Sequence, residues 1–190
     1  MLLHPNANFE LATRLQRGAA TIAEAYSFIS GLYFRGKVAY AEAFGAAPDG
    51  VPPAVIIVPG VGLAPLTTPL SAEQLRLIGD VSIERDHDTY RITLQRDARL
   101  LEQAAGPTCH FVLLGSIATD KYAQPLLDVF GQRLVFPADF VGRGDMSRGG
   151  LMLRSARTGV ELGYVAVAGA VRHGSRPPKL VPLPRKKRNV

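Results

Sequence analysis

The sequence predicts an α/β fold: a single three-layer domain with a small, mostly parallel β-sheet flanked by helices, followed by a basic C-terminal tail. Three short apolar runs, at 54–58, 110–114 and 134–136, are hydrophobic on both faces, as is typical of strands covered on both sides. Segments with helical apolar spacing separate these runs, and strands that alternate with helices favour a parallel sheet. With 190 residues, 47% of them hydrophobic, the chain is long enough for one well-buried core.

The N-terminal part of the domain, at 6–45, is expected to be helical. Apolar residues repeat on one helical face between Phe9 and Leu15 and predict a first helix. Thr21, with a glutamate three residues later, forms a capping box that predicts the start of a second helix. That helix should stop near Gly31, because glycine disfavours continued helix, and a third helical stretch is expected over 33–44.

The remainder of the domain, at 51–170, is expected to be Rossmann-like, so that a single domain covers 1–170. Each apolar run predicts a strand, and each capped or amphipathic segment predicts a helix. The elements expected after the 54–58 strand are a helix from Ser71 to Ile78, a helix from Tyr90 to Ala104, a strand at 110–114, a helix from Thr119 to Phe130, a strand at 134–136, a helix from Ser147 to Ala156 and an edge strand from Tyr164 to Val167.

The positive charge of the chain is concentrated at its C-terminal end. Residues 171–190 hold seven basic residues and no acid, which takes the net charge of +6 for the whole chain to −1 for 1–170. Four prolines in the same stretch predict an extended, mobile tail. Such a tail either contacts phosphates without sequence preference or is a solvated terminus that aids solubility. Its densest basic cluster is Arg185, Lys186, Lys187 and Arg188.

The chain is expected to be cytoplasmic and without a membrane partner. Cys109 is the only cysteine, which excludes an intrachain disulfide and fits a reducing compartment. Residues 1–10 lack the basic and apolar regions of a secretory signal, and no window approaches the ~20 apolar residues of a membrane span.

The glycine- and arginine-rich segment at 140–150 is the strongest candidate for a binding loop. Ligands of open α/β sheets bind beyond the carboxyl ends of the strands, and this segment follows the 134–136 strand. Arg143 and Arg148 carry guanidinium forks suited to phosphate, while Gly144 and Ser147 supply backbone and hydroxyl donors. In the alternative interpretation, the arginines pair with the neighbouring aspartates and the loop is structural.

Two further segments follow predicted strands. Gly60 and Gly62 permit close backbone approach after the first strand, although a plain turn also explains them. Ser116 and Thr119 lie before a predicted helix, where free N–H groups favour an anion or a ribose, although Thr119 as a simple helix cap is the alternative.

An aromatic and cationic stretch in the N-terminal part suits a nucleotide or a single strand. Tyr33 and Phe34 lie beside two cations, Arg35 and Lys37, and aromatic faces stack on bases while cations contact phosphate. Aromatic residues at helical spacing are also common in cores, and that interpretation is preferred for Phe34.

Support for catalysis is limited to two aspartates. Asp139 and Asp145 flank the glycine-rich loop and are the candidates for a general base. The run Asp-His-Asp at 86–88 lies in a polar loop with no further ligand at useful spacing, so neither a metal nor another cofactor is expected.

Four segments, in this order, resemble the small bacterial relatives of the peroxide-stress, DNA-binding YaaA-type proteins, many of which are domains of unknown function. They are Leu-Tyr-Phe-Arg-Gly-Lys at 32–37, Gly-Val-Gly-Leu at 60–63, Leu-Gly-Ser with Lys-Tyr at 114–122, and Arg-Gly-Asp-Met-Ser-Arg at 143–148. The resemblance implies a compact α/β domain with a cationic cleft and DNA or a nucleotide as the partner. The residues that it would carry over are Tyr33, Arg35, Tyr122, Arg143, Ser147 and Arg148.

The sequence leaves three functions open. The first is binding of nucleic acid or a nucleotide, with the 143–148 loop on phosphate and Tyr33 or Tyr122 on a base. The second is an enzyme that cleaves or transfers a glycosidic bond of a nucleoside or nucleotide at the same cleft. The third is a scaffold that recruits a partner through its basic tail.

Overall fold

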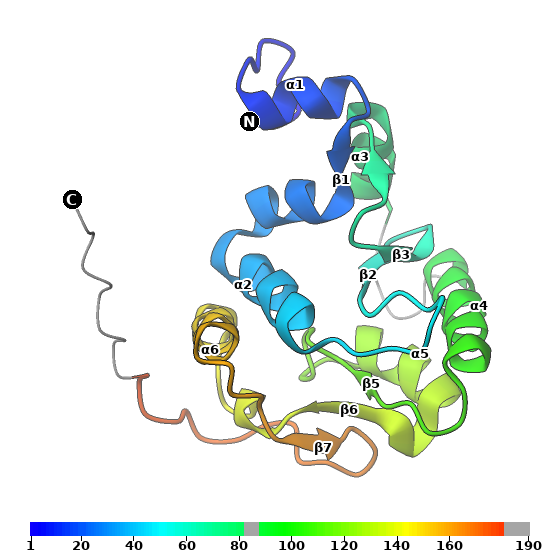
Figure 1. Ribbon diagram of the computed structural model, residues 1–190, viewed down its shortest axis with the longest axis vertical. Coiled ribbons are helices and arrows are strands. Elements are labelled where there is room, and N and C mark those ends of the chain that lie inside the picture. Colours follow the sequence, from blue (N-terminus) through cyan, green and yellow to red (C-terminus); the bar gives the residue numbers. More distant parts are fainter. Residues whose placement is uncertain (82–87, 181–190) are drawn as a thin grey trace.

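The computed structural model describes residues 1–81 and 88–180 and shows a mixed α/β fold with small sheets (Figure 1). Most of the expected helices are present within a residue or two of their predicted bounds. In chain order the elements are α1 (Glu10–Gln16), β1 (Ala20–Thr21), α2 (Ile22–Phe44), β2 (Val55–Val58), β3 (Gly62–Pro65), β4 (Pro69–Leu70), α3 (Ala72–Gly79), α4 (Asp88–Ala105), β5 (Phe111–Val112), α5 (Asp120–Phe130), η1 (Gly131–Arg133), β6 (Leu134–Pro137), η2 (Ala138–Phe140), α6 (Asp145–Thr158) and β7 (Tyr164–Ala166).

Local signals account for the start and the break of α2. The Thr21 hydroxyl accepts a hydrogen bond from the Glu24 N–H at 3.3 Å, and the Glu24 carboxylate accepts one from the Thr21 N–H at 2.8 Å. At Gly31 the backbone leaves the helical region, with φ 60° and ψ −135°, a conformation accessible to glycine. The predicted end near Gly31 is therefore a kink that divides α2 into two helical segments, and the second reaches Phe44 as expected.

The prediction of one mostly parallel sheet is wrong. The described strands form three small sheets: β1 with β4 and β2 with β3, both antiparallel, and β5-β6-β7, in which the β5–β6 pair is parallel and the β6–β7 pair antiparallel. The chain turns back after Val58, with Gly60 and Gly62 at positive φ, so β2 pairs with its own neighbour in sequence. An apolar run does not specify which strand it pairs with, and here the turn after Val58 determines that β2 pairs with β3.

The hydrophobic core lies in two clusters, one on each side of the β2–β3 hairpin. The first cluster joins α1, the first segment of α2, the β1–β4 sheet and α3, and it takes Ile56 and Val58 from the hairpin. The second joins the later segment of α2 to α4, α5, α6 and the β5-β6-β7 sheet, with Ile57 and Leu63 packed against it. The run at 54–58 is apolar on both faces because each face meets a different cluster.

Close contact between α2 and α6 positions the candidate site. A Cβ atom at Gly36 would lie 2.6 Å from the Gly149 carbonyl oxygen, and one at Gly149 would lie 2.8 Å from the Tyr33 Cα. The two helix backbones therefore touch, as Figure 1 shows for the later part of α2 beside α6. Further along α2, a 2.6 Å hydrogen bond joins the hydroxyls of Tyr40 and Tyr164 and ties the helix to β7.

The first ten residues of the expected tail lie against the body of the protein. Arg172 forms a 2.9 Å ion pair with Asp120 at the start of α5. A Cβ atom at Gly142 would lie 2.1 Å from the Ser175 carbonyl oxygen, so this segment also crosses the turn before α6. The basic residues Arg185, Lys186, Lys187 and Arg188 lie outside the described residues.

Candidate functional site

The later segment of α2 presents an aromatic ring and an ammonium group on one face. Tyr33 and Lys37 are one helical turn apart, and the Lys37 Nζ lies 4.1 Å from the centroid of the Tyr33 ring. The same ammonium is 5.7 Å from the centroid of the Phe34 ring. Both Tyr33 and Lys37 are partly buried, whereas Arg35, between them in sequence, is exposed.

Arg148 brings a buried guanidinium to the same place from α6. The residue is 5% exposed, and its Nε donates a 3.2 Å hydrogen bond to the Phe140 carbonyl oxygen. Its charge acts to lower the pKa of Tyr33, whose hydroxyl donates a hydrogen bond to the Leu114 carbonyl oxygen at 3.3 Å. The carboxylate of Asp145, one turn earlier on α6, is 4.0 Å from Arg148 Nη1. Three segments distant in sequence thus meet at one point.

The protonation of this cluster reflects its burial. Burial is the main cause that lowers the pKa of Lys37 to about 8; the charge of Asp145 opposes this shift, and the charge of Arg148 adds to it to a lesser extent. Burial likewise raises the pKa of Tyr33, against the effect of Arg148. Within the described part of the chain, no carboxylate lies within ion-pair distance of Lys37. Two cations therefore share a partly buried position with one exposed carboxylate.

Tyr122 completes the cluster from α5. Its ring meets that of Tyr90 edge-on, with centroids 6.4 Å apart, and the Lys121 Nζ lies 5.4 Å from the Tyr122 ring centroid. Burial raises the pKa of Tyr122, which also lies near enough to Tyr33 to influence its ionisation. We call Tyr33, Lys37, Tyr122, Asp145 and Arg148 the junction site.

The other residues of the glycine-rich loop stabilise the loop itself. The Arg143 guanidinium donates to the Asp139 carbonyl oxygen at 3.0 Å, the Ser147 hydroxyl at 3.3 Å and the Pro178 carbonyl oxygen at 3.4 Å. Gly144 is the N-cap residue of α6 and has extended backbone, with φ −78° and ψ 168°. Arg143 is therefore held mainly by carbonyl groups and not by the side chain of Asp139, whereas Arg148 does pair with Asp145, as the alternative interpretation expected.

Ser116 and Thr119 lie in the segment between β5 and α5, next to the Leu114 carbonyl that Tyr33 contacts. Thr119 is the N-cap residue of α5, but its side chain makes no capping hydrogen bond. Simple side-chain capping therefore does not explain Thr119.

Gly60 and Gly62 are not brought to the junction site, in contrast to the prediction. Gly60 lies in the turn between β2 and β3, and Gly62 is the first residue of β3; this end of the hairpin packs on α4, where the Leu63 N–H donates to the Asp97 carboxylate at 2.9 Å. A Cβ atom at Gly62 would lie 2.0 Å from the same carboxylate. Close packing against Asp97, together with positive φ, accounts for a glycine at position 62 without a ligand.

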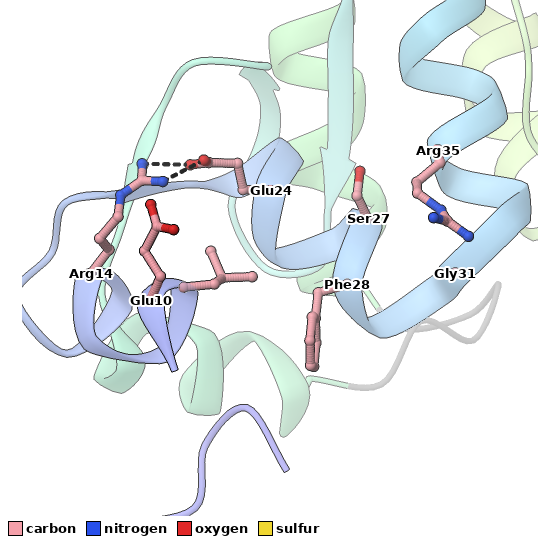
Figure 2. A pocket seen from close by; sticks show the side chains of 8 residues that line it. Glu10, Arg14, Glu24, Ser27, Phe28, Gly31 and Arg35 are labelled. Carbon is pink, nitrogen blue, oxygen red and sulfur yellow. Dashed lines mark hydrogen bonds and ion pairs between the residues drawn. The ribbon is translucent and has the colours of Figure 1, made fainter. Parts of the chain in front are cut away.

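Arg35 is instead part of a groove between α1 and the two segments of α2 on either side of the Gly31 kink, with a volume of about 590 Å³ (Figure 2). Near α1 the groove holds Arg14 and Glu24, which form a 2.6 Å ion pair, and the hydrogen bond from Arg14 lowers the pKa of Glu24. Its remaining lining residues are Glu10, Leu11, Ser27, Phe28 and Gly31.

Lys37 was noted as one of two cations in the 31–37 segment but was not chosen as a site residue. It belongs to the same motif as Tyr33 and Arg35, but a helix places residues four apart on one face and residues two apart on different faces. The spacing of four between Tyr33 and Lys37 is therefore the signal that could have selected Lys37 over Arg35.

No protein-family model, no curated protein and no solved structure matches the chain. Among the helices described for residues 1–81 and 88–180, none has both the length and the apolar character needed to cross a membrane.

Proposed function

We propose that the chain binds a nucleotide or a nucleic acid at the junction site, with Arg148 and Lys37 on phosphate and Tyr33 or Tyr122 against a base. The observation that carries the proposal is the pair of cations with only Asp145 to balance them. Burying like charges side by side is unfavourable, and a bound phosphate would offset this cost. Such uncompensated charge is more typical of a binding site than of a structural ion-pair network.

The relationship to the YaaA-type proteins is part of this proposal. Three of the four segments on which the resemblance depends, at 32–37, 114–122 and 143–148, contribute residues to the junction site. The segment at 60–63 packs against α4 instead, through the hydrogen bond from Leu63 to Asp97. The proposal therefore retains Tyr33, Tyr122 and Arg148 as ligand residues and replaces Arg35 with Lys37. A cytoplasmic location goes with a nucleotide partner.

The test is binding of ATP and of a fluorescent single-stranded oligonucleotide across a salt series. Arg148→Met and Lys37→Met should each weaken binding about tenfold or more, because each removes a charged hydrogen-bond donor. Arg35→Met is the matched control, since it removes a cation from the same motif on another face of α2. Equal losses in Arg35→Met and Lys37→Met would contradict the assignment of the site.

The same binding assay tests the contribution of the basic tail. A chain that ends at Leu180 keeps the segment that packs on α5 and α6 and lacks only 181–190. If the junction site is the binding site, this chain should retain binding of ATP and lose only the part of oligonucleotide affinity that is most sensitive to salt. Loss of all binding would favour the scaffold function.

An enzyme acting on a nucleoside or nucleotide is the second candidate, and the position of Asp145 favours it. The Asp145 side chain is 67% exposed beside Arg148, so it is accessible to a ligand on the junction site. Asp139 is a matched control for Asp145 as a general base, because Arg143 donates a hydrogen bond to the Asp139 backbone carbonyl oxygen and not to its side chain. Asp145→Asn should abolish turnover of a nucleoside monophosphate and preserve its binding, whereas Asp139→Asn should leave both unchanged.

A further inference from the structure

We propose that the groove of Figure 2 binds a short peptide with free ends, because it sets an excess carboxylate and a guanidinium without a described ion pair on opposite walls, with an aromatic ring between them. Its volume of about 590 Å³ is in the range of sites that bind small ligands. The groove shares no residue with the junction site, so this inference does not rest on the proposed function.

The wall nearest α1 carries one more negative charge than positive charge. Arg14 donates to both carboxylate oxygens of Glu24, at 2.6 and 2.9 Å, and to the Ala19 carbonyl oxygen at 3.0 Å, so its guanidinium is already used. Glu10, one turn before Arg14 on α1, places a second carboxylate beside this pair (Figure 2). The two carboxylates therefore share one cation, and the ammonium group of a ligand would balance the excess charge.

The opposite wall offers a cation and a hydroxyl group. Arg35 is exposed, and among residues 1–81 and 88–180 its guanidinium has no carboxylate within ion-pair distance. Ser27, from the first segment of α2, lines the groove on the same side and is partly buried (Figure 2). A guanidinium fork suits the two oxygens of a carboxylate, and a hydroxyl can donate one further hydrogen bond.

An apolar surface lies between the two charged walls. Phe28 lines the groove, is 39% exposed and stacks on Phe9 with the ring centroids 5.3 Å apart. Leu11 of α1 adds a partly buried aliphatic side chain. Apolar surface between charges of opposite sign suits a ligand that is charged at its two ends and apolar in its middle.

A short peptide has this distribution of charge. Its N-terminal ammonium would lie at Glu10, its C-terminal carboxylate at Arg35, and an apolar side chain against Phe28. A mononucleotide fits the groove less well, because the carboxylates of Glu10 and Glu24 would repel its phosphates. The groove and the junction site therefore select ligands of different charge.

The test is binding of the tripeptide Ala-Leu-Ala to the full-length chain, measured by NMR titration. Because the charged groups of the groove are largely exposed, we expect a Kd on the order of 1 mM. Acetylation of the peptide removes its ammonium group and amidation removes its carboxylate, so each should weaken binding about threefold or more. Equal binding of the three forms, or no binding at about ten times that concentration, would overturn the proposal.

Variants of the two walls assign each end of the peptide. Glu10→Gln and Arg35→Met should each weaken binding of the free tripeptide about threefold or more. In Arg35→Met, amidation of the peptide should cost no further affinity, and in Glu10→Gln the same holds for acetylation, because the modified end has already lost its partner. Unchanged affinity in both variants, or equal further losses on either modification, would overturn the proposal.

Matched controls come from the same two helices. Arg17→Met and Glu42→Gln remove exposed charges outside the groove and should leave binding of the tripeptide unchanged. Circular dichroism and thermal unfolding of all variants establish that each is folded. A loss in the controls as large as in Arg35→Met would show that the peptide responds to overall charge, which would overturn the proposal.

Comparison with ATP separates this inference from the proposed function. Lys37→Met should keep binding of the tripeptide and lose affinity for ATP, whereas Arg35→Met should do the reverse. If ATP binds as proposed and the tripeptide does not bind, the proposed function stands and the peptide site fails. Loss of tripeptide binding in Lys37→Met as large as in Arg35→Met would overturn the assignment of the peptide to the groove.

Discussion

The junction site and the groove of Figure 2 contain similar side chains, yet they differ in how their charges are compensated. In the groove, Arg14 and Glu24 pair at 2.6 Å, with their side chains 37% and 38% exposed. At the junction site, the Arg148 side chain is 7% exposed and Lys37 has no described carboxylate partner. The charges of Arg14 and Glu24 in the groove are therefore paired and hydrated, whereas those of the junction site are more buried and less fully balanced.

The two regions also differ in their construction. The groove lies where α2 bends away at Gly31 and leaves a gap beside α1, whereas the junction site lies where α2 and α6 touch through Gly36 and Gly149. One region depends on a kink and the other on close packing of two backbones. Substitutions in the junction site and in the groove should therefore change the free energy of unfolding and ATP binding by unequal amounts.

The largest effect is expected from Gly149→Ala. The added Cβ would lie 2.8 Å from the Tyr33 Cα, and backbone atoms cannot move aside without separating the helices. We expect a loss of about 2–3 kcal/mol in the free energy of unfolding, measured by urea denaturation, together with weaker binding of ATP.

Gly150→Ala is the control for this prediction. Its Cβ would lie 3.8 Å from Leu180 Cδ1, an ordinary contact, and alanine favours helix by up to about 1 kcal/mol over glycine. A similar loss of stability in the two variants would show that the contact between α2 and α6 is not the cause.

The next effect is expected from Arg148→Lys. A lysine keeps the charge but lacks the Nε donor through which Arg148 holds the Phe140 carbonyl oxygen. We expect a loss of about 1–3 kcal/mol in the free energy of unfolding, because a buried acceptor loses its donor, and about tenfold weaker ATP binding by calorimetry. Unchanged affinity would exclude the guanidinium from ligand binding.

The pH dependence of stability tests the state of Lys37. Its pKa is about 8 in the folded chain against 10.5 as the ordinary value, so between these values the unfolded chain binds more protons. The free energy of unfolding should therefore rise from about pH 8 towards pH 10, more in the wild type than in Lys37→Met. Saturating ATP should reduce the difference between the pH profiles of the wild type and Lys37→Met, because bound phosphate favours the ammonium form of Lys37. Parallel pH profiles of the two proteins without ATP would contradict a lowered pKa of Lys37.

The smallest effect is expected from Arg14→Lys in the groove. The pair with Glu24 is more than one third exposed, and exposed ion pairs contribute about 0–1 kcal/mol. Glu24 also keeps its hydrogen bonds with Thr21 in the capping box. Urea denaturation should show a loss below about 1 kcal/mol, and ATP binding should not change. A loss as large as that of Arg148→Lys would remove the contrast between the two regions.

Local sequence signals determined the helices of this protein. The capping boxes that begin with Thr21 and Ser71 and the break at Gly31 act within one or two turns of chain, so their effects are readable without knowledge of the fold. Tyr33 and Arg148 were expected to face one ligand, and the structure shows that the helices carrying them touch beside these residues, at Tyr33 and Gly149.

Tertiary structure decided the pairing of the strands and the membership of the site. The run at 54–58 is compatible with a parallel sheet or with a hairpin between two cores, and its apolar residues do not distinguish them. The choice of Lys37 over Arg35 depends on which face of α2 meets α6, and that face was set by the glycines at 36 and 149, which let the two backbones touch. Such contacts join residues more than one hundred positions apart, beyond the reach of local spacing.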